Sequence, residues 1–207
     1  EIARMIKNVI FDVGGVLMDF DTHALTWDLT GNEPDADILH QEIFDHPDWI
    51  ATDRGIPETA VLESIRGHLP PHLHAAAGEA LARWDEWLTP IAEINDLARE
   101  VDGLGCRVYI LSNTSEGFYR FCERIPAWPL VKGCILSFEE KLLKPDPEIF
   151  RRLLIRFGLA PGECFFVDDS HLNIEAARWC GLKGELYLHD AARVRAGLRA
   201  EGVPVAP

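Results

Sequence analysis

Three short apolar runs, each followed at once by polar residues, constrain the fold of this chain more than any other feature of its sequence. The runs cover residues 9–11, 108–111 and 164–167. Short apolar segments bounded by turn-forming residues are typical of strands buried on both faces of a parallel sheet. Two further runs, at 133–136 and 185–188, could flank them. The sequence therefore predicts a parallel sheet built from these segments.

Segments with helical periodicity lie between the predicted strands. One is expected to begin with Thr89 as its cap and Pro90 at its first position, and others to begin near Asp146 and Ser170. Strands that alternate with helices form a parallel α/β sheet, and the polar residues at the strand ends meet at one edge, where ligands bind. We therefore predict an α/β fold with a Rossmann-like parallel core.

Residues 19–88 differ from the rest of the chain. They contain helical patterns, several prolines and four of the six tryptophans, but no convincing strand. We expect a small all-helical insertion at 19–88, between the first strand and the rest of a core made of residues 1–18 and 89–207. A length of 207 residues fits one domain plus such an insertion. Trp49 is expected to pack in this insertion, and a position over a substrate is left open for it.

The charge balance excludes several classes of partner. The chain has 20 Lys and Arg against 34 Asp and Glu, which gives a net charge of −14. Such a surface repels phosphate backbones and anionic membranes, so we expect neither nucleic-acid nor membrane partners. No apolar run reaches the length of about 18 residues that a membrane-spanning helix needs. An anionic substrate would require local positive charge from a metal ion or a lysine.

The cysteine pattern points to a reducing compartment. Five cysteines are present, an odd number, and no C-x-x-C motif occurs. This pattern predicts neither a disulfide framework nor a zinc site. Reduced, mostly buried thiols are expected. Residues 1–7 also lack the basic-then-apolar order of a secretory signal. Both features favour a cytoplasmic protein.

Three carboxylates are expected to meet at the sheet edge. Asp12 follows the first predicted strand, and Asp168 and Asp169 follow another. In a partly desolvated cleft these groups would repel one another. A hard divalent cation would relieve the repulsion, and Mg²⁺ binds a few carboxylates together with waters and phosphate oxygens. The pattern therefore predicts a magnesium site.

Three further groups could hold an anion next to these carboxylates. Lys144 offers a compact positive charge, and Ser112 and Asn113 offer hydrogen bonds at the end of a predicted strand. Taken singly, a turn-forming serine or a surface lysine would explain each of them. Together with the carboxylates, they suit an anion that is attacked by a carboxylate.

Four segments resemble the sequence motifs of the haloacid dehalogenase (HAD) superfamily, in the family's order. The first reads Phe-Asp-Val-Gly-Gly-Val-Leu-Met-Asp at 11–19, and the second reads Leu-Ser-Asn-Thr at 111–114. The third begins Lys-Pro-Asp-Pro at 144, and the fourth contains Val-Asp-Asp-Ser at 167–170. The insertion matches the small helical cap of the superfamily's first cap class. The resemblance implies a HAD-like core with a cap at 19–88.

The resemblance also implies a nucleophile and a metal site. Asp12 would be the nucleophile that forms an aspartyl-phosphate, which divides one hard displacement into two easier ones. Mg²⁺ would be held by Asp12, the backbone carbonyl of Gly14 and Asp169, with Asp168 as a ligand or as a partner of the ligands. The ion would stabilise the charge of the transition state.

The substrate would be held by the remaining motifs. Ser112 and the backbone amide of Asn113 would bind phosphate oxygens. Lys144 would neutralise the phosphate and orient Asp12. The resemblance therefore implies a Mg²⁺-dependent phosphatase (a phosphoric monoester hydrolase) for a small phosphorylated metabolite, with sugar phosphates as one candidate class.

Gly14 departs from the pattern of most phosphatases in the superfamily. They carry a second Asp at this position as general acid and base, a function typically worth about 10²–10⁴-fold in rate. An Asp-x-Gly-x-Val motif is similar to a branch of bacterial sugar-phosphate phosphatases, including a glucose-1-phosphate phosphatase. Sugar 1-phosphates need less help for their leaving group. Otherwise Asp19, His171 or a side chain of the cap could supply the proton.

Two other functions remain open at this stage. A 2-haloacid dehalogenase would also use Asp12 as nucleophile, but needs no metal, and its pattern lacks the paired Asp168 and Asp169. A catalytically weak phosphate-binding domain is supported by Gly14 alone. The intact carboxylate cluster favours the metal-dependent phosphatase over both.

Overall fold

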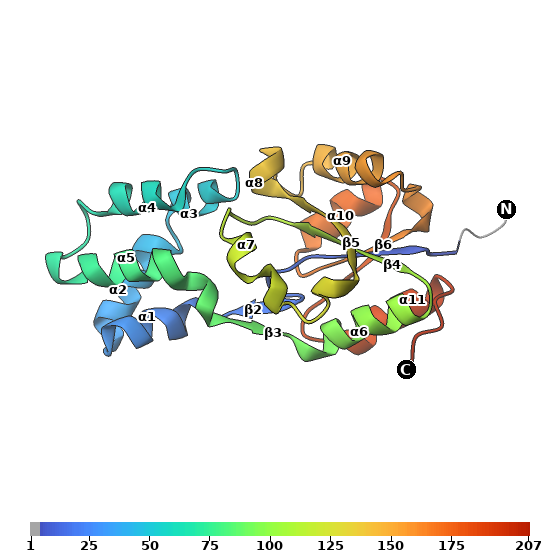
Figure 1. The fold of residues 1–207 in the computed structure, drawn as a ribbon, viewed down its shortest axis with the longest axis horizontal. Coiled ribbons are helices and arrows are strands. Elements are labelled where there is room, and N and C mark those ends of the chain that lie inside the picture. The colour runs from blue at the N-terminus through green and yellow to red at the C-terminus, as the bar shows by residue number, and fades with distance from the viewer. Residues whose placement is uncertain (1–4) are drawn as a thin grey trace.

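A five-stranded parallel sheet forms the core of the described chain, residues 5–207 of a computed structural model (Figure 1). The strand order is β5-β4-β1-β6-β7. The strands are β1 (Asn8–Phe11), β4 (Arg107–Ser112), β5 (Val131–Leu136), β6 (Cys164–Asp168) and β7 (Lys183–Leu186). The predicted α/β class is confirmed, although β7 begins two residues earlier than its apolar run. Residues 1–4 of the expected core lie outside the described residues.

Helices cover both faces of this sheet. Figure 1 shows α9 (Pro147–Phe157) and α10 (His171–Trp179) on one face, and α6 (Ala92–Gly103) and α11 (Ala191–Ala200) on the other. Side chains of β1 alternate between the two layers. Val9 and Phe11 belong to the apolar cluster that includes α6 and α11, and Ile10 belongs to the cluster with α9 and α10. Burial on both faces explains why residues 9–11 of this strand are all apolar.

The start of α9 follows the sequence signals. The Asp146 side chain accepts a hydrogen bond from the amide of Glu148 at 2.9 Å, and Pro147 occupies the first helical position. Gly158 ends the helix in a left-handed conformation, with φ of 62°. A polar N-cap, proline at the first position and glycine after the last are the expected boundary residues.

The expected start of the helix after residue 88 was wrong. Thr89 and Pro90 belong to a short strand, β3 (Leu88–Pro90), and α6 begins only at Ala92. This strand pairs antiparallel with β2 (Met18–Phe20). The backbone pairing between segments distant in sequence overrides the local helix-start signal. Three-residue strands carry no periodic pattern, so the β2–β3 ribbon could not be seen in the sequence.

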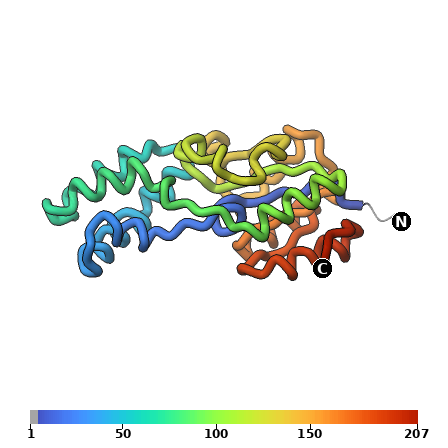
Figure 2. Tube along the Cα trace, turned by 60° about the horizontal axis from the view of Figure 1, so that its bottom comes forward, coloured from blue at the N-terminus to red at the C-terminus, as the bar shows by residue number. Residues whose placement is uncertain are grey.

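Residues 22–87 form a helical unit that projects from one end of the molecule (Figure 2). Strand β2 leads into it and β3 leads out of it. Its helices are α1 (Thr22–Thr30), α2 (Glu33–Ile43), α3 (Pro47–Thr52), α4 (Glu58–Ile65) and α5 (His74–Arg83), with 3₁₀ turns η1 (Pro71–Leu73) and η2 (Trp84–Trp87). The unit lies at the end of the sheet towards which β1 runs.

The remaining elements are short. They are α7 (Phe118–Phe121), α8 (Ser137–Glu140) and the 3₁₀ turns η3 (Cys122–Arg124), η4 (Trp128–Leu130) and η5 (Pro161–Glu163). All five cysteines are free thiols, as predicted. In the described part of the chain, none of the helices is both long enough and apolar enough to span a membrane.

Candidate active site

Lys144 joins two carboxylates from different strands. Its ammonium nitrogen lies 2.8 Å from Oδ1 of Asp12 and 2.7 Å from Oδ2 of Asp168, and it donates to the carbonyl of Leu111 at 3.0 Å. All three charged residues are buried. Asp12 follows β1 and Asp168 ends β6, and these two strands are neighbours in the sheet. The structure therefore brings these residues together at one edge of the sheet, as predicted.

Asn113 holds the segment that carries Lys144. Its side-chain amide donates to the backbone carbonyl of Lys144 at 3.0 Å and accepts from the backbone amide of the same residue at 2.8 Å. This pair of bonds fixes the backbone from which the ammonium group extends. The sequence suggested only that the backbone amide of Asn113 would bind phosphate, so the positioning by its side chain was missed.

The two neighbouring aspartates have different surroundings. Oδ1 of Asp168 accepts hydrogen bonds from the amide of Ser170 at 2.8 Å and from the side chain of Asn173 at 2.9 Å, while Oδ2 faces Lys144. The side chain of Asp169 is exposed and lies against the backbone of Gly15. Asp168 is thus occupied by protein donors, whereas Asp169 is free to face a ligand.

Gly15 is required by this arrangement. Its φ is +70°, and a Cβ at this position would overlap Oδ2 of Asp169. Only glycine combines the left-handed backbone with the close approach. By contrast, a Cβ on Gly14 would meet no atom within 4 Å.

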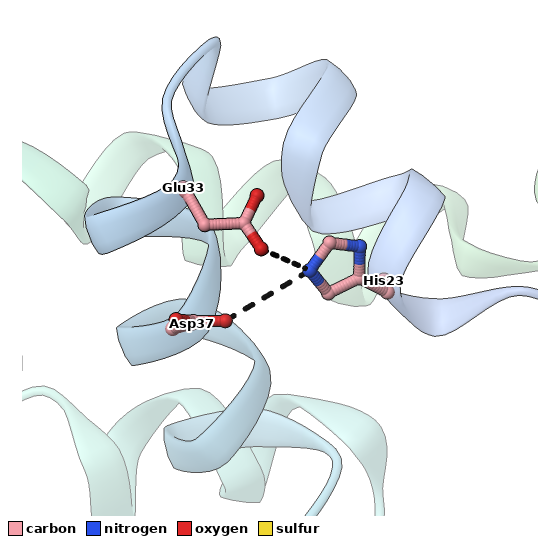
Figure 3. Close-up of side chains that lie close together, drawn as sticks. All are labelled: His23, Glu33 and Asp37. Atoms are coloured by element: carbon pink, nitrogen blue, oxygen red, sulfur yellow. Dashed lines mark hydrogen bonds and ion pairs between the residues drawn. The ribbon is translucent and has the colours of Figure 1, made fainter.

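Oxygen atoms of Asp12, Asp168 and Asp169 all lie within 4.8 Å of one another. Carboxylate oxygens gathered at this spacing fit the predicted Mg²⁺, with Asp12 and Asp169 as the available donors. A second group of possible ligands, His23, Glu33 and Asp37, lies on the surface of α1 and α2 (Figure 3). There a single nitrogen, Nε2 of His23, faces both carboxylates, at 3.1 and 3.8 Å. That geometry is typical of an exposed ion pair.

The electrostatics of the site call for positive charge. Burial raises the pKa of Asp12, the charges of Asp168 and Asp169 add to this effect, and Lys144 opposes it. Burial alone would lower the pKa of Lys144, but the two carboxylates more than offset this and raise it. Burial and the charge of Asp168 also raise the pKa of Asp169. A carboxylate nucleophile must be ionised, so a cation next to Lys144 would favour the reactive form of Asp12.

A cavity of about 160 Å³ opens beside this cluster. Gly14, Ser112 and Asn113 line it on the side of the core. Ser112 is the buried last residue of β4 and Asn113 follows it, so both lie at the end of a strand, as predicted. A larger surface hollow of about 550 Å³ lies between β7 and α11 and contains none of the predicted site residues.

The other side of the cavity is aromatic. Four rings line it: Phe20, Trp49, Trp84 and Phe121. Trp84 contacts the other three rings, with centroid distances between 5.4 and 5.8 Å. Trp49 therefore packs against Trp84, as expected, and also lines the cavity, so a position over a substrate stays a prediction.

Glu58 of the helical unit ties this aromatic side to the core. Its Oε1 accepts from the indole of Trp84 at 3.0 Å and from the hydroxyl of Ser115 at 2.7 Å, and its Oε2 pairs with Arg120 at 3.0 Å. Both partners belong to the core: Ser115 lies in the loop that follows β4, and Arg120 lies on α7. This buried network could not be predicted from the sequence, since its members share no spacing or motif.

Two residues that could have replaced an acid at position 14 lie elsewhere. Asp19 is exposed, and its carboxylate accepts from the amide of Phe20 at 3.0 Å. His171 is exposed and lies 3.7 Å from Glu175 on its own helix. Neither lines the cavity. Asp53 of the helical unit does line it, and the sequence did not single it out.

A family model described as haloacid dehalogenase-like hydrolase matches residues 6–181. The chain belongs to this family. It is a HAD-like hydrolase whose predicted motifs all fall within the matched region.

Two relatives and one solved structure illustrate the similarity. The chain is 30% identical over 193 residues to the sesquiterpene phosphatase astK of Aspergillus oryzae, covering 89% of this chain and 91% of that one. It is 29% identical to a D-ribitol-5-phosphate phosphatase of Bacteroides thetaiotaomicron, covering 86% and 90%. A HAD family enzyme from the latter organism, solved with magnesium and inorganic phosphate, has a TM-score of 0.67 at 25% identity, covering 87% and 93%.

Proposed function

We propose that this HAD-like hydrolase is a Mg²⁺-dependent phosphatase that acts on a small phosphorylated metabolite through an aspartyl-phosphate on Asp12. The observation that carries the proposal is the buried Lys144, which holds Asp12 at 2.8 Å beside two further carboxylates and an open cavity. The names of two relatives, a sesquiterpene phosphatase and a D-ribitol-5-phosphate phosphatase, support the same reaction class.

Asp12 carries the covalent step. A carboxylate oxygen attacks phosphorus, and the bond between phosphorus and the ester oxygen breaks, so that the alcohol leaves. Water then attacks the same phosphorus, which releases inorganic phosphate and regenerates the carboxylate. Lys144 favours the ionised form of Asp12 and holds its carboxylate in place. Ser112 and the backbone amide of Asn113 hold phosphate oxygens.

The metal is assigned to Asp12, the carbonyl of Gly14 and Asp169. Asp168 is assigned a positioning role, because Lys144, Ser170 and Asn173 already occupy its oxygens. When bound, Mg²⁺ supplies positive charge to the phosphate oxygens, which is the main electrostatic requirement of phosphoryl transfer.

The helical unit is proposed to act as the cap of this enzyme, with boundaries at residues 19 and 88. Its aromatic rings close the cavity on the side where the leaving group lies, so they exclude water from the reacting phosphate. Aromatic walls favour an alcohol with apolar surface. Sugar phosphates remain the second candidate class, because the flat face of a sugar can also pack on a ring.

The proposal is tested with 4-nitrophenyl phosphate, with and without Mg²⁺, using the wild type and Asp12→Asn. We expect turnover that requires Mg²⁺ and is lost in the variant. A panel of sugar phosphates and farnesyl phosphate then ranks the two substrate classes. Release of halide from a 2-haloacid in the presence of EDTA, without any phosphatase activity, would overturn the proposal in favour of a dehalogenase. The cytoplasmic location remains a prediction.

A further inference from the structure

The cavity contains one acid, Asp53, to which the proposed mechanism assigns no role. Among the described residues that line the cavity, Asp53 carries the only ionisable side chain. Gly14 lines the same cavity, and the space next to its Cα is open. The wall of the cavity therefore has no acid at position 14 but has one on the helical unit.

The Asp53 carboxyl group has no partner within the described chain. It is half-buried, and no hydrogen bond or ion pair to another described residue engages its side chain. Lys144 is the one charged group that acts on it appreciably. Burial raises the pKa of Asp53 to about 7, and Lys144 opposes this effect. An acid with such a pKa holds its proton in part of the molecules at neutral pH and can both give and take it.

The turn that carries Asp53 is seated on the core. Asp53 follows α3, and Gly55, two residues later, has φ of +86°. A Cβ on Gly55 would overlap the ammonium of Lys141 and lie 2.8 Å from the carbonyl oxygen of Phe138. Both neighbours belong to α8 or follow it directly. The turn is thus packed tightly against the core, which fixes the position of Asp53 relative to the catalytic cluster.

We propose that Asp53 is the general acid and base of this enzyme and performs the task for which Gly14 has no side chain. This inference rests on the proposed phosphatase function. As the carboxylate of Asp12 attacks phosphorus, the ester oxygen takes the electron pair of the breaking bond and the proton of Asp53. The Asp53 carboxylate then takes a proton from the water that attacks phosphorus. Alcohol and phosphate leave, and both aspartates return to their starting forms.

The role of Asp53 predicts a dependence on the leaving group. Phenyl phosphate and 4-nitrophenyl phosphate have nearly the same shape, but phenolate is by far the poorer leaving group. The test compares both esters in the wild type, in Asp53→Asn and in Asp48→Asn. The last variant is a matched control, because Asp48 is a partly exposed acid on α3, the helix that Asp53 directly follows, and does not line the cavity. Thermal melts show that each variant is folded.

For Asp53→Asn we expect kcat on phenyl phosphate to fall by about 10²–10⁴-fold, with a much smaller loss on 4-nitrophenyl phosphate. Asp48→Asn should match the wild type on both. The wild-type kcat for phenyl phosphate should decline as the pH rises through about 7, and this decline should be absent in Asp53→Asn. Introducing Gly14→Asp into the Asp53→Asn protein should restore turnover of phenyl phosphate.

Equal losses on the two esters, or a change in KM alone, would overturn the inference, because a positioning or binding residue has no reason to sense the leaving group. That result would leave the phosphatase proposal intact. Failure of the wild type to hydrolyse either ester with Mg²⁺ would overturn the proposed function itself and the role of Asp53 with it.

Discussion

Lys144 is buried between two carboxylates, so its charge should matter greatly for stability as well as for catalysis. Its ammonium lies 2.8 Å from Asp12 and 2.7 Å from Asp168. The substitution Lys144→Met removes the charge but keeps a side chain of similar length, which limits the cavity it leaves. Removing one partner of a buried ion pair typically costs about 3–5 kcal/mol. For a chain of this size, that corresponds to a fall in Tm of about 6–20 °C.

The size of the effect should depend on pH. Without Lys144, the charge that opposes the raised pKa of Asp12 is gone, so the carboxyl group takes up a proton more readily. Protonation removes the repulsion with Asp168. The loss of stability in Lys144→Met should therefore be largest at pH 8 and should shrink towards pH 5.5. Mg²⁺ should recover part of the loss at pH 8, because it supplies positive charge at the same carboxylates.

The assay is urea unfolding at both pH values, with Lys132→Met as control. Lys132 is half-exposed and lies 4.0 Å from Asp102, so its ion pair is worth about 0–1 kcal/mol. If the two variants were equally stable at pH 8, or if the deficit of Lys144→Met did not change with pH, the buried charge would not have the role assigned to it.

Four substitutions test other parts of the site. Gly15→Ala should lower the free energy of unfolding by about 1–2 kcal/mol and weaken Mg²⁺ binding, because the Cβ displaces Asp169. Gly14→Ala should leave both properties nearly unchanged. Calorimetry of the two variants with Mg²⁺ measures both effects. Trp49→Ala should raise KM for aryl phosphates by about tenfold while leaving kcat nearly unchanged, as steady-state kinetics would show, because one aromatic wall is lost. Because the pKa of Asp53 is raised to about 7, ionisation of this group lowers the stability of the folded wild type as the pH rises towards and through 7. The Asp53→Asn variant lacks this loss. Its free energy of unfolding, relative to that of the wild type, should therefore be about 1–3 kcal/mol higher at pH 8 than at pH 5, as measured by urea unfolding.

Much of the catalytic cluster was predictable because it depends on strand ends. Parallel strands place their carboxyl ends at the same edge, so a polar residue directly after an apolar run has a defined position. Asp12 and Asp168 were located in this way from the sequence. Lys144 was located by its motif, and the structure places it between the two carboxylates.

Other features depend on contacts that no local pattern encodes. The β2–β3 ribbon forms because two three-residue segments pair with each other although the whole helical unit separates them in the sequence. The need for glycine at position 15 arises from the approach of Asp169, which is distant in sequence. Asp53 was missed because it belongs to no motif, and its position in the cavity depends on how its turn packs against α8.

The central claim is that Asp12 forms the covalent intermediate, and trapping that intermediate tests it most directly. The wild type is mixed with 4-nitrophenyl phosphate and Mg²⁺, quenched in acid within the first turnover and reduced with borohydride, which converts an aspartyl-phosphate to homoserine. Peptide mass spectrometry should then find homoserine at position 12, and none without substrate or in Asp12→Asn. Turnover with no modification at Asp12, or with modification of another carboxylate, would contradict the account.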